Sequence, residues 1–167
     1  MSYSTTYRRL RYRGAWAPLA VAMVVMSMTA CGVSIPTDPD GTLQRVESSG
    51  ELRVGATPAG DALTVDGNHV SGPLADLVEG FAHAHGARVE WTVASEETLV
   101  DELEDGSLDL AAGGMTDATP WVDRVSVTRG FTGVDGSDGK PLVVILPLGE
   151  NALQFAIEKY FDDQGAS

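Results

Sequence analysis

The sequence predicts an α/β fold: a single three-layer lobe in which a mostly parallel sheet is flanked by helices. Short β-rich runs alternate with segments whose apolar residues recur at helical spacing. This alternation is typical of parallel strands joined by right-handed helical crossovers. The chain of 167 residues is long enough for one domain of ordinary size and too short for two full ones.

Turn and capping residues mark the expected elements between residues 50 and 163. Asp66-Gly67 lies between two short runs and predicts a hairpin. Pro73 suits the first position of a helix, and Ser95, which two acids follow, suits a helix N-cap. Glycines after the apolar periods predict where helices end. The expected elements are strand 52–56, hairpin 63–70, helix 73–86, strand 88–93, helix 95–106, strand 108–112, strand 125–128, strand 142–146 and helix 149–163.

Charge is distributed unevenly along the chain. Four arginines lie before residue 14, whereas the chain from residue 31 onward holds 7 basic and 24 acidic residues, a formal net charge of −17. Nucleic-acid binding needs a positively charged surface, so this acidic body excludes nucleic acid as a partner.

The first residues have the parts of an export signal. Residues 8–13 are rich in arginine, residues 15–30 carry no charge, and small residues precede Cys31, the only cysteine. The run Met28-Thr29-Ala30-Cys31-Gly32 resembles a bacterial lipobox, in which the cysteine is lipidated. The alternative is an uncleaved membrane anchor, for which the uncharged run is slightly short.

These features predict how the chain is anchored. We expect a lipoprotein signal peptide over residues 1–30 and lipid attachment at Cys31. Residues 31–49 contain prolines, serines and threonines without an apolar period, so we expect a flexible tether there. The protein would then be lipid-anchored to the cell membrane on its extracytoplasmic side.

The segment 106–124 is the expected ligand site. Its short apolar strand, 108–112, breaks at Gly113-Gly114 into a loop rich in hydroxyl groups. Such a loop places N–H and hydroxyl groups at the carboxyl end of a strand, where open α/β sheets bind ligands.

An ordered set of short segments matches one known family. The segments are Gly50-Glu-Leu-Arg-Val-Gly-Ala-Thr-Pro58, Gly72 with Asp76-Leu77, Leu103 with Gly106 and Asp109, Gly114-Met115-Thr116, Thr119-Pro120 and Gly149-Glu150-Asn151-Ala152. This order resembles the amino-acid class (family 3) of type II periplasmic solute-binding proteins, the receptors of ABC importers. The resemblance covers roughly residues 48–163.

The family has two lobes that close on the ligand like a clamshell, and the second lobe is almost absent here. Only residues 129–141 separate the outgoing strand from the returning strand, whereas a second lobe needs on the order of 80 to 100 residues. The resemblance therefore implies one solute-binding-like lobe over 50–163, with a short flexible loop replacing the second lobe and a tail over 164–167. A single wall leaves ligand contacts competing with water, so we expect weak binding unless a partner supplies the other wall.

The resemblance also implies which residues contact the ligand. In the family, a Gly-Met-Thr loop and an arginine soon after a Thr-Pro pair hold the amino and carboxylate groups of an amino acid. In this sequence the arginine is displaced and the loop is lengthened. The candidate ligand-binding residues are Thr57, Gly113, Gly114, Met115, Thr116, Thr119, Trp121 and Arg124.

Three of these candidates have an alternative structural role. Arg124 either makes a bidentate contact with a ligand carboxylate or pairs with Asp123 or another surface acid. Trp121 is either a lid over the site or an aromatic packed beneath the loop. Met115 is either a core residue or a ligand contact.

We therefore expect a protein that binds a small amino-acid-like solute and is linked to ABC-type transport or sensing through a membrane transporter or sensor protein. No cofactor or metal is expected: His83 and His85 lie on different helix faces, and residues 135–139 lack the glutamate that completes a calcium loop. No nucleophile–base set is evident, so no enzyme is expected. The alternatives are a protein-interaction module that has lost solute binding and, more distantly, an enzyme like the cyclohexadienyl dehydratases, which share the two-lobed fold.

Overall fold

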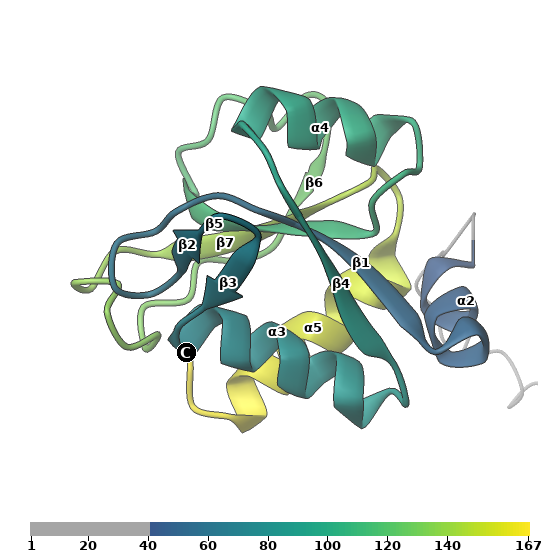
Figure 1. The fold of residues 1–167 in the computed structure, drawn as a ribbon, viewed down its shortest axis with the longest axis horizontal. Helices are drawn as coiled ribbons and strands as arrows, with labels where there is room; N and C mark the ends of the chain where they lie inside the picture. The colour runs from purple at the N-terminus through teal and green to yellow at the C-terminus, as the bar shows by residue number, and fades with distance from the viewer. Residues whose placement is uncertain (1–40) are drawn as a thin grey trace, which may run out of the picture. The chain divides into compact units, whose positions relative to one another are not determined.

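The computed structural model describes residues 41–167 (Figure 1). The predicted signal peptide and Cys31 lie outside the described residues. No helix within residues 41–167 is long and apolar enough to cross a membrane. The elements are α2 (Thr42–Ser49), β1 (Glu51–Ala56), β2 (Thr64–Asp66), β3 (His69–Ser71), α3 (Pro73–Ala84), β4 (Arg88–Val93), α4 (Glu96–Glu104), β5 (Leu110–Thr116), β6 (Ser126–Val127), β7 (Leu142–Leu146) and α5 (Asn151–Asp163).

The central sheet has the strand order β4-β1-β5-β7-β6. Strand β1 is parallel to both of its neighbours, with Val54 beside Trp91 of β4 and Leu110 of β5. Strand β7 is antiparallel to β5, and β6 is antiparallel to β7. Within this sheet β7 alone runs against the other four strands, which confirms the predicted mostly parallel sheet.

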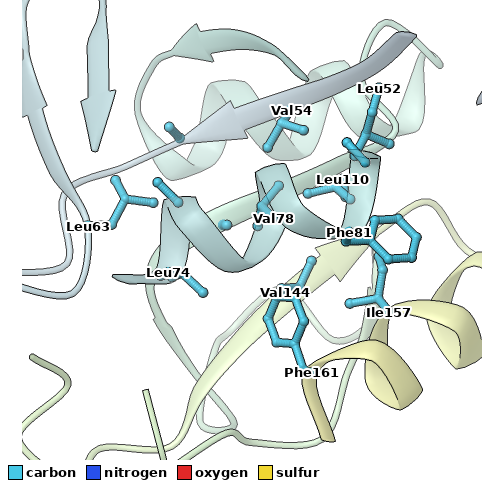
Figure 2. Close-up of a cluster of buried hydrophobic side chains, with 14 of the residues drawn as sticks. Leu52, Val54, Leu63, Leu74, Val78, Phe81, Leu110, Val144, Ile157 and Phe161 are labelled. Atoms are coloured by element: carbon cyan, nitrogen blue, oxygen red, sulfur yellow. The ribbon is translucent and has the colours of Figure 1, made fainter. Parts of the chain in front are cut away.

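The sheet lies between two layers of helices, α4 on one face and α3 with α5 on the other (Figure 1). Figure 2 shows the core on the α3/α5 face, where Val54 and Leu110 of the sheet lie near Phe81 of α3 and Phe161 of α5. A second buried cluster fills the α4 face and is formed by Leu99, Val100, Leu103, Leu108, Ala111, Met115, Val125, Val143 and Ile145. Burial of each large side chain contributes about 1.5–3 kcal/mol of transfer free energy, so both faces contribute to the stability of the lobe.

The predicted flexible tether is wrong for residues 42–49, which form helix α2. Val46 is fully buried in the core of the α3/α5 face, and Arg45 forms an ion pair with Asp109. A helix of eight residues is too short to be stable alone, so these contacts with the body must hold it in place. Residues 31–40 of the predicted tether lie outside the described part of the chain.

Strand β5 also differs from its prediction. The sequence predicts a strand that breaks into a loop at Gly113-Gly114, whereas β5 continues through both glycines to Thr116. The pairing of β5 with β7 shifts register between Ala112 and Thr116. The glycines therefore lie in an irregular stretch of strand, and the loop begins after Thr116.

The segment 129–141 packs onto the body rather than forming an open flexible turn. Phe131 and Val134 are buried in the core of the α3/α5 face. Phe131 and Leu142 exchange two backbone hydrogen bonds (2.8 and 3.1 Å), which close the base of the segment. The predicted tail also packs here, because Gly133 N donates to the carbonyl of Ala166, a buried residue (3.1 Å).

Candidate functional site

The carboxyl ends of three parallel strands meet at one edge of the sheet. Ala56 of β1 lies between Val93 of β4 and Ala112 of β5. The alignment continues past the strands, because Thr57 N donates to the Ala112 carbonyl (3.1 Å) and Ala94 N donates to the Ala56 carbonyl (3.4 Å). We call the segments 57–61, 94–97 and 113–123 the carboxyl edge.

The glycines at positions 113 and 114 allow the first of these segments to lie close against β5. A side-chain carbon on Gly113 would lie 2.0 Å from Thr57 Oγ1 and 2.5 Å from the Thr57 carbonyl oxygen. A side-chain carbon on Gly114 would lie 2.9 Å from the Pro58 carbonyl oxygen. Only glycine permits this approach, so the Gly-Gly pair holds Thr57 in its place at the edge.

Two hydroxyl groups at the carboxyl edge are buried without a hydrogen-bond partner. Thr57 and Thr119 are 6% and 8% exposed, and neither Oγ1 atom has a partner within residues 41–167. Buried polar groups are normally hydrogen-bonded, and an unpaired one costs about 1–3 kcal/mol. A ligand group that bonds to these hydroxyls would recover that cost. The two hydroxyls are therefore the feature of this edge that points most directly to a ligand.

A carboxylate and an indole ring lie at the same edge, on the side of the sheet that α4 covers. Glu96, the first residue of α4, accepts a hydrogen bond from Trp121 Nε1 (3.4 Å). Trp121 packs against the buried cluster of the α4 face. Thr57 lies on this side too, because it contacts Gly113, which alternates along β5 with Met115 of that cluster. Sequence analysis used the two acids after Ser95 only as signs of a helix start, although the position of Glu96 three residues after the end of β4 was a usable signal.

Arg124 directly follows the carboxyl edge, and its Cζ lies 5.7 Å from the centroid of the Trp121 ring. Its guanidinium contacts Asp101 (2.7 Å) and Glu104 (3.0 Å from Nε), which lie further along α4 than Glu96. These two carboxylates raise the pKa of the Arg124 guanidinium above its ordinary value. Of the two interpretations of Arg124, the structure shows the surface ion pair. The acids that pair with it lie on α4, and Asp123 is not one of them.

The remaining candidates divide between the edge and the core. Met115 is 2% exposed and packs in the cluster of the α4 face, so it is a core residue. Trp121 is half-buried on that cluster, within the edge. Apart from Met115, six of the eight candidates belong to the segments of the edge: Thr57, Gly113, Gly114, Thr116, Thr119 and Trp121.

The ion pair of Arg124 predicts a pH dependence of stability. The hydrogen bond from Arg124 lowers the pKa of Glu104 below that of an ordinary glutamate. A depressed carboxylate pKa stabilises the native state above the unfolded-state pKa of roughly 4.3 and loses this contribution as pH falls through the folded-state pKa. Glu104→Gln should lower the thermal unfolding midpoint slightly at pH 7, and the difference from wild type should shrink as pH falls below about 4.3.

A control on the same helix tests this assignment. Glu102 makes no ion pair within the described residues, so Glu102→Gln should show no such trend across the same pH series. A Glu104→Gln difference that stays constant from neutral to acid pH would contradict the ion-pair interpretation.

A second charged cluster lies toward the opposite end of the parallel strands and holds α2 against the body. Asp109 is 1% exposed and accepts a hydrogen bond from the backbone N–H of Arg53 (2.8 Å). Its carboxylate also pairs with the side chains of Arg53 (2.5 Å) and Arg45. This hydrogen bond to Asp109 raises the pKa of Arg53. A hollow of about 600 Å³ lies beside the cluster. The arginines of the cluster are already paired with acids, so we assign a structural role to the cluster and not a ligand-binding one.

Within residues 41–167, no group of three histidine, cysteine, aspartate or glutamate side chains is placed to hold a metal ion.

No protein-family profile matches the chain. A curated relative, the membrane-bound lytic murein transglycosylase F 2 of Alkalilimnicola ehrlichii, is 32% identical over 103 residues. The match covers 60% of this chain but only 22% of the relative, so the chain spans less than a quarter of that protein.

Solved structures similar to the lobe come from solute-binding proteins. The arginine-bound form of domain 1 from TmArgBP has 20% identity and a TM-score of 0.60, over 71% of this chain and 97% of that chain. An ancestral cationic amino acid solute-binding protein has 14% identity and a TM-score of 0.60, over 74% and 93%. Tv2483 bound to L-arginine has 8% identity and a TM-score of 0.63, over 75% and 89%. At these identities the likeness establishes the fold, that of a solute-binding protein domain.

Proposed function

We propose that this chain is a solute-binding-like lobe that binds a small amino-acid-like molecule at the carboxyl edge. The proposal rests on the hydroxyl groups of Thr57 and Thr119 at the carboxyl edge. Both are buried, and neither has a hydrogen-bond partner within the described residues. Unpaired buried polar groups are costly, and a bound polar solute would satisfy them. The position also agrees with the general placement of ligands at strand carboxyl ends.

Similarity to known structures supports binding by a lobe of this size. One neighbour is an isolated domain 1 in its arginine-bound form, and this chain covers 97% of it. A second lobe is therefore not a precondition for a ligand in a domain of this fold. We propose that this lobe likewise binds its solute without a clamshell partner, with low affinity because one wall leaves the ligand partly in water.

We propose further that the lobe acts at the outer face of a membrane, tethered by a lipid on Cys31, and serves transport or sensing through a membrane protein. The export-type N-terminus supports this location. Cys31→Ser should move the protein from the membrane fraction to the soluble fraction or leave the precursor uncleaved. Unchanged fractionation and processing would exclude the lipid anchor.

A thermal-shift screen of the full chain in mild detergent tests solute binding. A ligand that binds the native state raises the unfolding midpoint by mass action, by an amount that grows with concentration. The screen should contain arginine, lysine, neutral amino acids and polyamines at millimolar concentration. We expect at least one of these solutes to raise the midpoint.

Matched threonine variants show where the solute binds. Thr57→Val keeps the shape of the side chain but removes the hydroxyl, so it should abolish the shift. Thr64→Val, on the exposed hairpin strand β2, should leave the shift unchanged. The binding function would be rejected if no solute shifted the midpoint, and the site would be rejected if both variants behaved alike.

A protein-interaction module is the second candidate, and the partial match to the transglycosylase favours it. That match occupies 22% of a larger protein, as a module within a multidomain enzyme does. We propose no catalytic role for the chain. Co-purification of one membrane protein together with a negative solute screen would favour the interaction module.

A further inference from the structure

We infer that the carboxyl edge selects an organic cation that carries no free carboxylate, such as an amine or a guanidine. This inference rests on the proposed solute-binding function and narrows the chemical class of the solute. It follows from three observations: the sign of the charges at the edge, the pairing or distant placement of the cationic side chains, and the acceptor groups beside Thr57.

The charged side chains of the carboxyl edge are all acidic. They come from each of its three segments, and the two on the longest segment are exposed. Clustered charges of one sign create a local potential that raises the concentration of counter-ions, here cations. The acidic residues are Asp61, Glu96, Glu97, Asp117 and Asp123.

The arginine next to the carboxyl edge is already paired with acids. Arg124 lies over the Trp121 ring and is held by Asp101 and Glu104 of α4. An incoming carboxylate would have to displace two carboxylates from it. The ion pairs therefore leave Arg124 a poor receptor for a ligand carboxylate.

The other cations of residues 41–167 lie away from the site. Arg129 pairs with Asp162 and Lys159 with Asp163, both at α5. Arg88 begins β4 and so lies at the opposite end of the sheet from the carboxyl edge. Arg45 and Arg53 pair with Asp109 near that same opposite end.

Lys140 is the one exposed cation near the end of β5, and the fold places its segment on the other face. The segment 129–141 packs through Phe131 and Val134 into the core of the α3/α5 face. Thr57 and Trp121 lie on the α4 face of the same sheet. The segment that carries Lys140 is therefore held on the α3/α5 face, where Gly136 packs against the backbone of Asp61 and Ala62.

The groups beside Thr57 can accept hydrogen bonds from a cation. The Glu96 carboxylate is half-buried at the start of α4, and the oxygens of Thr57 and Thr119 have no other partner within the described residues. The Trp121 ring already has the guanidinium of Arg124 over it, with Cζ 5.7 Å from the ring centroid. A ligand carboxylate at this place would face Glu96, and the charge of the nearby Arg124 is already compensated by Asp101 and Glu104.

Arginine and two of its derivatives test the inference, because all three share the guanidinium and the side-chain length. Agmatine lacks the carboxylate, and argininamide carries it as a neutral amide. Titration calorimetry on the full chain should show agmatine and argininamide binding at least about tenfold more tightly than arginine. Arginine binding as tightly as agmatine, or more tightly, would overturn the inference while leaving the proposed function intact. If none of the three bound, the inference would fail, whereas the proposed function would fail only if the solute screen were negative as well.

Charge-neutral variants identify the acceptor. Glu96→Gln should weaken agmatine binding by about tenfold, because it removes the charge beside Thr57. Glu97→Gln makes the same change one residue further along α4, on an exposed side chain, and should change the affinity by less than about threefold. Equal effects of the two variants would overturn the assignment of Glu96.

Two further variants test whether a carboxylate receptor is present after all. Arg124→Gln and Lys140→Ala should leave arginine binding unchanged, because Arg124 is already paired with Asp101 and Glu104 and Lys140 belongs to a segment that packs on the α3/α5 face. A selective loss of arginine binding in either variant, with agmatine binding intact, would show that a carboxylate is bound and would overturn the inference.

Discussion

Gly113→Ala should lower the free energy of unfolding by about 3 kcal/mol, at the upper end of the usual cost of overpacking. The added methyl carbon would lie 2.0 Å from Thr57 Oγ1, 2.5 Å from the Thr57 carbonyl oxygen and 3.0 Å from Thr57 N. The hydroxyl can rotate away, but two of these atoms belong to the backbone and cannot move without separating residue 57 from β5. Urea denaturation followed by circular dichroism would measure the change. If residue 57 is displaced, solute-induced thermal shifts should be lost as well.

Two comparisons isolate this contact. Adding Thr57→Ala to Gly113→Ala removes the hydroxyl but not the carbonyl oxygen at 2.5 Å, so only part of the lost stability should return. Gly60→Ala places a methyl group in open space at a φ of +59° and should cost only about 1 kcal/mol, from backbone strain. A Gly113→Ala variant as stable as wild type would contradict the close packing of residues 57 and 113.

Asp109→Ala should lower the free energy of unfolding by about 3 kcal/mol. Breaking a buried ion pair by removing one partner typically costs about 3–5 kcal/mol, because the other charge is left without compensation. We expect the lower end of this range because water can solvate the two arginines once Asp109 is removed. Their side chains are 36% and 30% exposed, whereas that of Asp109 is 1% exposed. Thermal and urea denaturation would measure the loss, and amide hydrogen exchange should show faster opening of α2.

Graded variants separate the charge from the backbone hydrogen bond. Asp109→Asn keeps an oxygen that can accept from Arg53 N but removes the charge, so it should cost less than Asp109→Ala. Asp105→Ala removes an exposed carboxylate near the same hollow, where it accepts from Ser107 N (2.9 Å), and its effect should be small. Equal losses in Asp105→Ala and Asp109→Ala would show that Asp109 has no special structural role.

Much of the fold could be predicted from the sequence, because the local signals agree with the tertiary structure. Ser95 accepts from Thr98 N as an N-cap (3.3 Å), and Pro73 begins α3 as the sequence indicates. Helix α2 could not be predicted, since Leu43 and Val46 are its only large apolar residues. Its stability comes from contacts with residues far away in the sequence, such as Asp109.

The candidate site could be predicted only in part. The sequence correctly predicts a strand that ends near this segment, but Gly113 and Gly114 lie within β5 and only the residues after Thr116 form the loop. The position of Arg124 depends on which acids lie across from it on α4, and sequence spacing contains no information about those distances. The same holds for Glu96, whose importance depends on the neighbouring ends of β1 and β4.

The closed base of the segment 129–141 makes this lobe a suitable carrier for an inserted reporter domain. Phe131 and Leu142 already fix the two ends side by side through reciprocal backbone hydrogen bonds. The tip between them, at Gly139 and Lys140, is exposed and has open space around the glycine, and such tips tolerate insertions well. A circularly permuted fluorescent protein placed there would be anchored at the end of β7, on the opposite face from the candidate site, so ligand binding could be read out without covering Thr57.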